Sequence, residues 1–207
     1  MSRAWIGAAI AGLAIAIADA VVALVWPDPV PAHEAIAHVA VGATWIGAGL
    51  VAWARHPELR IGPLMAAVGF TWYLTELWWP AAVPATVFYL LDELVLAVAL
   101  HAVLAFPSGR LRTRLERVVV AGGYATVLVG NLASVLVWDP ARSGCAECAR
   151  NLLLVQRSPF VDDVLSTARP AIGVALGAVA VTLLVRRWRF ATAAGRAVLG
   201  PVCGPPR

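Results

Sequence analysis

Residues 5–26 decide the fold class: they read WIGAAIAGLAIAIADAVVALVW, with Asp19 as the only charged residue. A helix needs about 20 mostly apolar residues to cross a hydrocarbon core roughly 30 Å thick. This stretch is long and apolar enough to do so. Five further stretches have the same character, and together they predict about six spans at residues 5–26, 36–54, 63–79, 86–106, 118–138 and 164–185.

The composition of the whole chain agrees with this prediction. Of 207 residues, 61% are hydrophobic and 14% charged, and the mean hydropathy is +0.80. An ordinary soluble domain has about 45–50% apolar and about 25% charged residues, so a soluble enzyme of this length is excluded. Disorder is excluded as well, because it requires low hydrophobicity. Each span must be helical to satisfy its backbone in lipid, which predicts an all-α, polytopic transmembrane helix bundle. The third stretch is short, and we expect Arg169 and Pro170 to interrupt the sixth.

The distribution of arginine predicts the orientation. All sixteen basic residues are Arg, and twelve fall in the N-terminal end, the loop 55–62, the loop 107–117 and the C-terminal tail. By the positive-inside rule these segments, and therefore both termini, are cytoplasmic, in a multi-pass protein of the cell membrane. Because these arginines lie between apolar runs, we expect the lipid bilayer as partner and no nucleic acid. The cytoplasmic anchors are Arg110, Arg112, Arg114, Arg117, Arg186, Arg187 and Arg189. A cleaved secretory signal ending at residues 16–18 is an alternative for the first span.

Two connections carry further signals. The segment 106–112 (FPSGRLR) stops the fourth span at Pro107, and it is either a topology anchor or a regulatory contact. The outer loop 139–163 contains Cys145 and Cys148, which outside the membrane favour a disulfide; a redox-active pair is the alternative. Two ligands do not close a zinc site. The Leu-rich stretch that follows either lies against the membrane or caps the bundle.

Four of these features, in this order, resemble the N-terminal membrane sensor region of actinobacterial sensor histidine kinases. They are His56-Pro57 with Ile61-Gly62, the turn 106–111 (FPSGRL), Cys145-x-x-Cys148 leading into residues 151–155 (NLLLV), and Arg186-Arg187-Trp188-Arg189. The resemblance covers residues 1–196 and implies one six-span sensor-like domain. In full-length members it also implies a cytoplasmic kinase core, transferase activity and a response regulator as partner.

The end of the chain departs from that family. Residues 197–207 are rich in Pro and Gly and are expected to be irregular, and no phosphoacceptor helix or Gly-rich phosphate loop follows the spans. We therefore expect a truncated, frameshifted or fragmentary sensor region with no catalytic machinery, metal or cofactor of its own. Whether the chain forms part of an enzyme depends on a kinase core that this sequence lacks.

Ionisable residues inside the spans are the candidate ligand-sensing or proton-sensing groups. They are Asp19, Glu76, Asp92, Glu93 and Arg169, and the predicted topology places all five in the outer half of the membrane. One interpretation is an outward-open polar pocket that senses a cation, a proton or a small basic molecule, with Arg169 paired to one carboxylate. The alternative is that each group reaches the interface separately or bonds to a neighbouring helix. His101 is a weaker candidate as a titrating switch.

These features favour a signal-input region of a two-component system. A small transporter using intramembrane carboxylates is the alternative, although no internal repeat supports it. A thiol oxidoreductase is disfavoured, since beyond Cys145 and Cys148 only Cys203 remains. Gly173-x-x-x-Gly177 would allow close helix approach, either within the bundle or in a homodimer.

Overall fold

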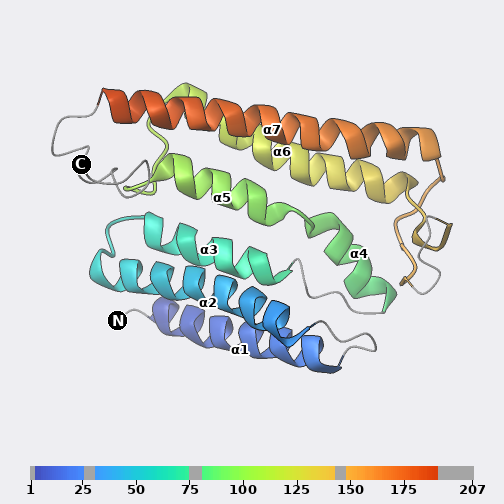
Figure 1. Ribbon diagram of the computed structural model, residues 1–207, viewed down its shortest axis with the longest axis horizontal. Coiled ribbons are helices and arrows are strands. Elements are labelled where there is room, and N and C mark those ends of the chain that lie inside the picture. Colours follow the sequence, from blue (N-terminus) through green and yellow to red (C-terminus); the bar gives the residue numbers. More distant parts are fainter. Residues whose placement is uncertain (1–2, 26–30, 75–80, 143–147, 191–207) are drawn as a thin grey trace.

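The computed structural model describes residues 3–25, 31–74, 81–142 and 148–190. It shows an elongated bundle whose helices run along its long axis (Figure 1). The described part holds seven α-helices and one short 3₁₀ helix. They are α1 (Arg3–Val25), α2 (Ala32–Arg55), α3 (Ile61–Leu74), α4 (Ala82–Leu91), α5 (Leu94–Ala105), α6 (Arg114–Val137), η1 (Pro140–Arg142) and α7 (Pro159–Arg189). No strand occurs among these residues, which confirms the all-α fold class.

Five helical segments are long and apolar enough to cross a membrane, which identifies a helical membrane protein. They are α1, α2, the combined segment Ala82–Ala105, α6 and α7. Helix α3 is apolar but covers only 14 described residues, and the rest of the predicted third span, residues 75–79, lies outside the described part. The described chain therefore supports five spans. The sixth span stays a prediction.

The helices pack in two groups. Helix α1 packs against α2 and α3, whereas α7 packs against α6 and α5, and the contact between α3 and α5 joins the two groups. Close approach of α2 and α3 depends on glycine. A Cβ atom at Gly62 would lie 2.6 Å from the backbone nitrogen of Trp53, and one at Gly49 would overlap the backbone nitrogen of Ala66. Two helices that touch backbone to backbone gain dispersion energy without needing large side chains.

Several predicted boundaries differ from the structure. Helices α2 and α6 each begin four residues before the predicted spans, because the polar first turn of each helix lies beyond the apolar stretch. The first turn of α6 is fixed by a capping box in which Thr113 and Glu116 bond each other's backbone N–H groups. Helix α7 begins at Pro159, capped by Ser158, so the outer connection is shorter than the predicted loop 139–163.

Two expectations about the spans are wrong. Helix α7 continues through Arg169 and Pro170 without interruption. Proline removes one backbone N–H donor, and membrane helices tolerate this where neighbouring groups or small local adjustments satisfy the freed carbonyl. The fourth span, expected as one helix over 86–106, is instead two helices, α4 and α5, separated at Asp92 and Glu93. Because α4 begins at Ala82, this break lies close to the middle of the segment Ala82–Ala105.

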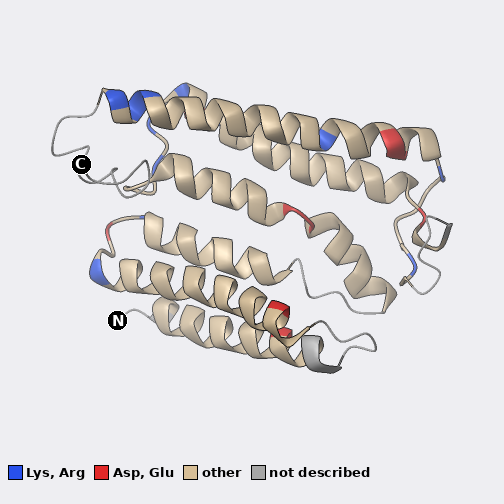
Figure 2. Cartoon of the chain, in the orientation of Figure 1, with Lys and Arg blue, Asp and Glu red and all other residues tan. Residues whose placement is uncertain are grey.

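Basic and acidic residues concentrate at different places along the bundle (Figure 2). Most of the arginines lie at the end of the bundle where α1 begins and α7 ends. Acidic residues appear mainly in the middle and toward the other end, which holds the connection between α6 and α7. We call these two regions the arginine-rich end and the opposite end.

The connection 148–158 caps the C-terminal end of α6, which lies at the opposite end of the bundle. The Asn151 side-chain amide donates to the carbonyl of Val135 at 2.6 Å and to that of Trp138 at 2.9 Å. Backbone N–H groups of Val155 and Ser158 bond to carbonyls in the last turn of α6. These bonds satisfy carbonyls that a helix end leaves open. These contacts agree with the expectation that this segment caps the bundle, while Leu152, Leu153 and Val155 are exposed, so contact of the Leu-rich stretch with the membrane stays a prediction.

Candidate functional site

The break between α4 and α5 is built from polar contacts. Glu93 has a left-handed backbone conformation with φ of 62°, which is unfavourable for a residue with a Cβ atom. The Asp92 carboxylate accepts a hydrogen bond from the Glu93 backbone N–H at 2.9 Å. Strained residues of this kind persist only where surrounding contacts hold them, and they concentrate at functional sites.

Helix α6 supplies the contact that holds the break. The side-chain amide of Asn131, which is only 2% exposed, donates to the carbonyl of Leu90 at 3.2 Å and to that of Asp92 at 2.5 Å. Interrupting a helix frees carbonyl groups, and in lipid each one without a partner would cost several kcal/mol by order of magnitude. Asn131 therefore makes the break compatible with the membrane.

Helix α7 supplies a charge to the same place. Arg169 donates from Nη2 to Oε2 of Glu93 at 2.6 Å and from Nη1 to the Ser134 hydroxyl at 3.3 Å. Its Nε is buried and has no hydrogen-bond partner among the described residues. Gly130 on α6 makes room for the side chain, because a Cβ atom there would lie 2.9 Å from Cδ of Arg169. Three elements thus meet at one ion pair, which we call the mid-span ion pair (Glu93 and Arg169).

Asp19 lies in a different cluster, within the first group of helices. Its carboxylate is 3.9 Å from Nε2 of His38 on α2, and the residue is only 4% exposed. The imidazole of His38 stacks on Trp72 of α3 at 4.9 Å between ring centroids, and Tyr73 donates to the carbonyl of Val39 at 2.7 Å. Asp19 is therefore buried against a neighbouring helix, close to His38, which agrees with one of the two alternatives predicted for these groups.

The structure therefore divides the five intramembrane candidates. Glu93 and Arg169 are joined and Asp92 is adjacent to them, whereas Asp19 belongs to the cluster with His38. Glu76 lies outside the described residues. Nδ1 of His101 on α5 lies 3.4 Å from the hydroxyl oxygen of Tyr124 on α6. A Cβ atom at Gly173 or Gly177 would meet nothing within 4 Å, so in the described part this pair packs against no other helix.

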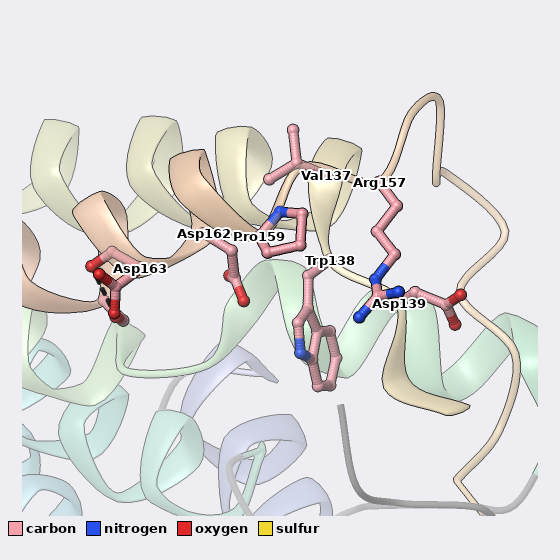
Figure 3. Close-up of a pocket in the computed structure, with 8 residues that line it drawn as sticks. Val137, Trp138, Asp139, Arg157, Pro159, Asp162 and Asp163 are labelled. Carbon is pink, nitrogen blue, oxygen red and sulfur yellow. Dashed lines mark hydrogen bonds between the residues drawn. The ribbon is translucent and has the colours of Figure 1, made fainter. Parts of the chain in front are cut away.

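A cavity at the opposite end was not predicted. It has a volume of about 340 Å³ and lies where α7 begins, beside the end of α6 (Figure 3). Asp162 extends from the first turn of α7 toward the Trp138 indole, and Arg157 lies beside Asp139. Three carboxylates and one guanidinium line the cavity, which we call the acidic cavity (Trp138, Asp139, Arg157, Asp162, Asp163 and neighbouring residues).

The chemistry of the acidic cavity favours a small cation. Its carboxylates outnumber its guanidinium three to one, and the face of an indole attracts a cation as well. The volume is at the lower end of the range for small-molecule sites. Among the described residues no cluster of three His, Cys, Asp or Glu side chains is arranged to hold a metal ion.

Sequence reasoning missed the acidic cavity for an identifiable reason. Hydropathy singles out ionisable residues inside the apolar spans, and Asp139, Asp162 and Asp163 lie at the borders of the predicted outer loop. The adjacent pair Asp162-Asp163 was the available signal. At the predicted cysteine pair, Cys148 is disulfide-bonded, and Cys145 lies outside the described residues, so their pairing stays a prediction.

Comparison with known proteins adds nothing to this geometry. No family model, curated protein or solved structure matches the chain.

Proposed function

We propose that this chain is the membrane signal-input region of a two-component sensor histidine kinase, in the cell membrane, with its arginine-rich end in the cytoplasm. Small organic cations bound in the acidic cavity are the proposed stimulus. The kinase core and the response regulator would be separate from the residues of this chain. The four sequence features that resemble such sensor regions support the family assignment, and the charge distribution supports the orientation.

One observation supports the proposal most directly: the single helix α7 connects the acidic cavity, the mid-span ion pair and the arginine-rich end. Its 31 residues span about 46 Å at 1.5 Å per residue. Asp162 and Asp163 in its first turns line the acidic cavity, and Arg169 forms the mid-span ion pair. In its last turn, Arg187 donates to the carbonyl of Leu104 at 3.5 Å. A displacement of this rigid helix at the cavity would therefore reach the arginine-rich end.

In this proposal the mid-span ion pair is the part of the bundle that switches between two conformations, one with and one without the cation bound. A ligand shifts a conformational equilibrium only by the difference in its affinity for the two states. The pair links α7 to a span that is already divided, and the Glu93 side chain is 40% exposed, so it can rearrange without unfolding a continuous helix. Cation binding beside Asp162 would then be transmitted by α7 as a change in its contact with α5.

Contacts at the arginine-rich end support a transmitting role for the turn 106–112. The backbone N–H of Arg60 donates to the carbonyl of Ser108 at 3.2 Å, and Gly109 has a φ of 74° and packs against the Arg60–Ile61 peptide. Two of the four resembling features, the segments around residues 56–62 and 106–111, therefore touch. This proximity is compatible with a regulatory contact at this turn, one of its two predicted roles.

A chimeric kinase tests the proposal. The whole chain is joined after Arg207 to the dimerisation and catalytic core of a heterologous histidine kinase, at several linker lengths, and reconstituted in liposomes. Spermidine, putrescine and tetramethylammonium are added, and autophosphorylation is measured. We expect at least one cation to change the rate, and Asp162→Asn with Asp163→Asn to abolish that change. Glu34→Gln, an exposed carboxylate outside the cavity, is the matched control and keeps it.

Two further results bear on the assignment. Coding sequence for a kinase core directly after Arg207, followed by a response-regulator gene, is expected; an unrelated gene in that place argues against the assignment. Absence of a response to all three cations at every linker length contradicts the proposed stimulus.

A transporter is the second candidate, and the broken span favours it. Transporters use discontinuous helices with charged groups near the middle of the membrane. Uptake of the same cations into proteoliposomes distinguishes the two functions. Accumulation that requires Glu93 and follows an ion gradient would support transport and contradict an input role, whereas binding without flux supports signal input.

A further inference from the structure

A second cavity lies at the arginine-rich end, far from the acidic cavity. Its volume is about 640 Å³, and it is open along one side, so we call it the arginine groove. It is formed where α3 begins, α5 ends and α6 begins. Its polar lining consists of Arg60, Arg110, Arg117 and His101, and its apolar lining includes Leu64 and Ala67.

The three guanidinium groups of the groove have no carboxylate partner among the described residues. In the part of the chain that the structure describes, none of them forms an ion pair, and no carboxylate lines the groove. The acids closest in sequence to these arginines, Glu58 and Glu116, do not line the groove and make other contacts. Oε2 of Glu116 accepts from the backbone N–H groups of Arg112 and Thr113, and Glu58 lies 3.5 Å from His56. The groove therefore has a strong local excess of positive charge.

The apolar part of the groove lies on the membrane side of these charges. Leu64 and Ala67 are in the first turns of α3, and His101 is one turn before the end of α5, so all three belong to apolar helical segments. Arg60 precedes α3, Arg110 follows α5, and Arg117 lies in the first turn of α6. An occupant must therefore combine an anionic group with an apolar chain, in that order along the membrane normal. A soluble phosphate would use only half of this surface.

We propose that the arginine groove is a binding site for an anionic phospholipid. The lipid phosphate lies among Arg60, Arg110 and Arg117, and one acyl chain lies along Leu64 and Ala67. Arginine suits this role because its planar guanidinium bonds two phosphate oxygens at once. Since Arg60 belongs to the α2–α3 connection and Arg110 to the α5–α6 turn, the lipid bridges the two groups of helices. The site does not depend on a sensor function.

Native mass spectrometry of the full chain tests the site. The protein is purified in detergent and titrated with phosphatidylglycerol or phosphatidylcholine of the same acyl composition. We expect discrete binding of one phosphatidylglycerol and much weaker binding of phosphatidylcholine. In Arg60→Gln, Arg110→Gln, Arg117→Gln together, we expect the affinity for phosphatidylglycerol to fall about tenfold or more, because each arginine contributes to anionic lipid binding.

Two controls separate a groove from general surface charge. The first control is a triple variant that removes the same charge from exposed positions at the same end but outside the groove: Arg114→Gln, Arg186→Gln, Arg189→Gln. We expect it to bind one phosphatidylglycerol with unchanged affinity. Ala67→Phe fills the apolar part without changing any charge and weakens phosphatidylglycerol binding. Melting temperatures show that each variant is folded, and Ala67→Phe keeps the test decisive if the triple arginine variant does not fold.

Three outcomes overturn the proposal. Equal loss of affinity in the two triple variants would show general attraction to the surface. Unchanged affinity in Ala67→Phe would show that no acyl chain occupies the groove. Full competition by millimolar inorganic phosphate or by soluble glycerophosphoglycerol would show a site for a free anion instead.

Discussion

Arg169 and Glu93 lie 76 positions apart in the sequence, and their side chains meet at 2.6 Å in the middle of the bundle. Their contact links α7, the longest of the described helices, to the predicted span that is divided into α4 and α5. Gly130 and Asn131, adjacent on α6, serve the two sides of this arrangement: the first leaves space for the arginine and the second bonds the carbonyls at the break. Each of these contacts can be tested by substitution.

Removing one partner of the mid-span ion pair should cost more than removing both. Arg169→Gln or Glu93→Gln leaves one charge without its partner in a low-dielectric environment, and we expect either single change to lower stability by about 1–3 kcal/mol. The double variant should recover part of this loss. Unfolding by SDS in mixed micelles gives the four free energies of a double-mutant cycle. If the losses of the two single variants simply add in the double variant, the two side chains do not interact directly. Glu34→Gln, at an exposed position, is the control and should leave the free energy of unfolding unchanged.

Asn131→Leu should destabilise the bundle although it keeps the volume of the side chain. The substitution leaves the carbonyls of Leu90 and Asp92 without a donor, which we expect to cost about 1–3 kcal/mol. Leu132→Ala, at the next position but 45% exposed on the surface of α6, should have a much smaller effect. The same SDS unfolding measurement compares them. Equal losses would show that Asn131 does not support the break.

Gly109→Ala should be one of the most damaging single-methyl changes in the chain. Its φ of 74° disfavours any side chain, and a Cβ atom would overlap the backbone between Arg60 and Ile61. The conformational part alone costs about 1–2 kcal/mol. Gly47→Ala is the matched control, because a Cβ atom there meets nothing within 4 Å, and it should be neutral or stabilising by up to about 1 kcal/mol. Melting temperatures in detergent decide between these outcomes.

Reporter fusions test the proposed orientation. Alkaline phosphatase, which is active only outside the cytoplasm, should be inactive when fused after Ser108 and active when fused after Leu153. Green fluorescent protein fusions at the same two positions should give the reverse pattern, because the positive-inside rule places the arginine-rich end in the cytoplasm. Phosphatase activity after Ser108 would show that the orientation is inverted. Activity after both positions would contradict the predicted topology.

Homodimerisation stays a prediction. The structure leaves Gly173 and Gly177 facing open space rather than another helix of the bundle, which removes the alternative of packing within the described part of one chain. A second copy or lipid can cover this face equally well on steric grounds. The kinase core and the response regulator likewise remain proposals that rest on the resemblance.

The sequence by itself determined that this is a helical membrane protein, approximately where its apolar helices lie and which end is rich in arginine. These properties are local, because composition, length and charge of each segment decide whether it can enter lipid. The tertiary structure alone decided that Asp92 and Glu93 divide a span, that Arg169 joins Glu93 while Asp19 lies near His38, and that two cavities form at opposite ends. Each of these depends on side chains from several helices meeting, and hydropathy does not encode which faces of those helices meet.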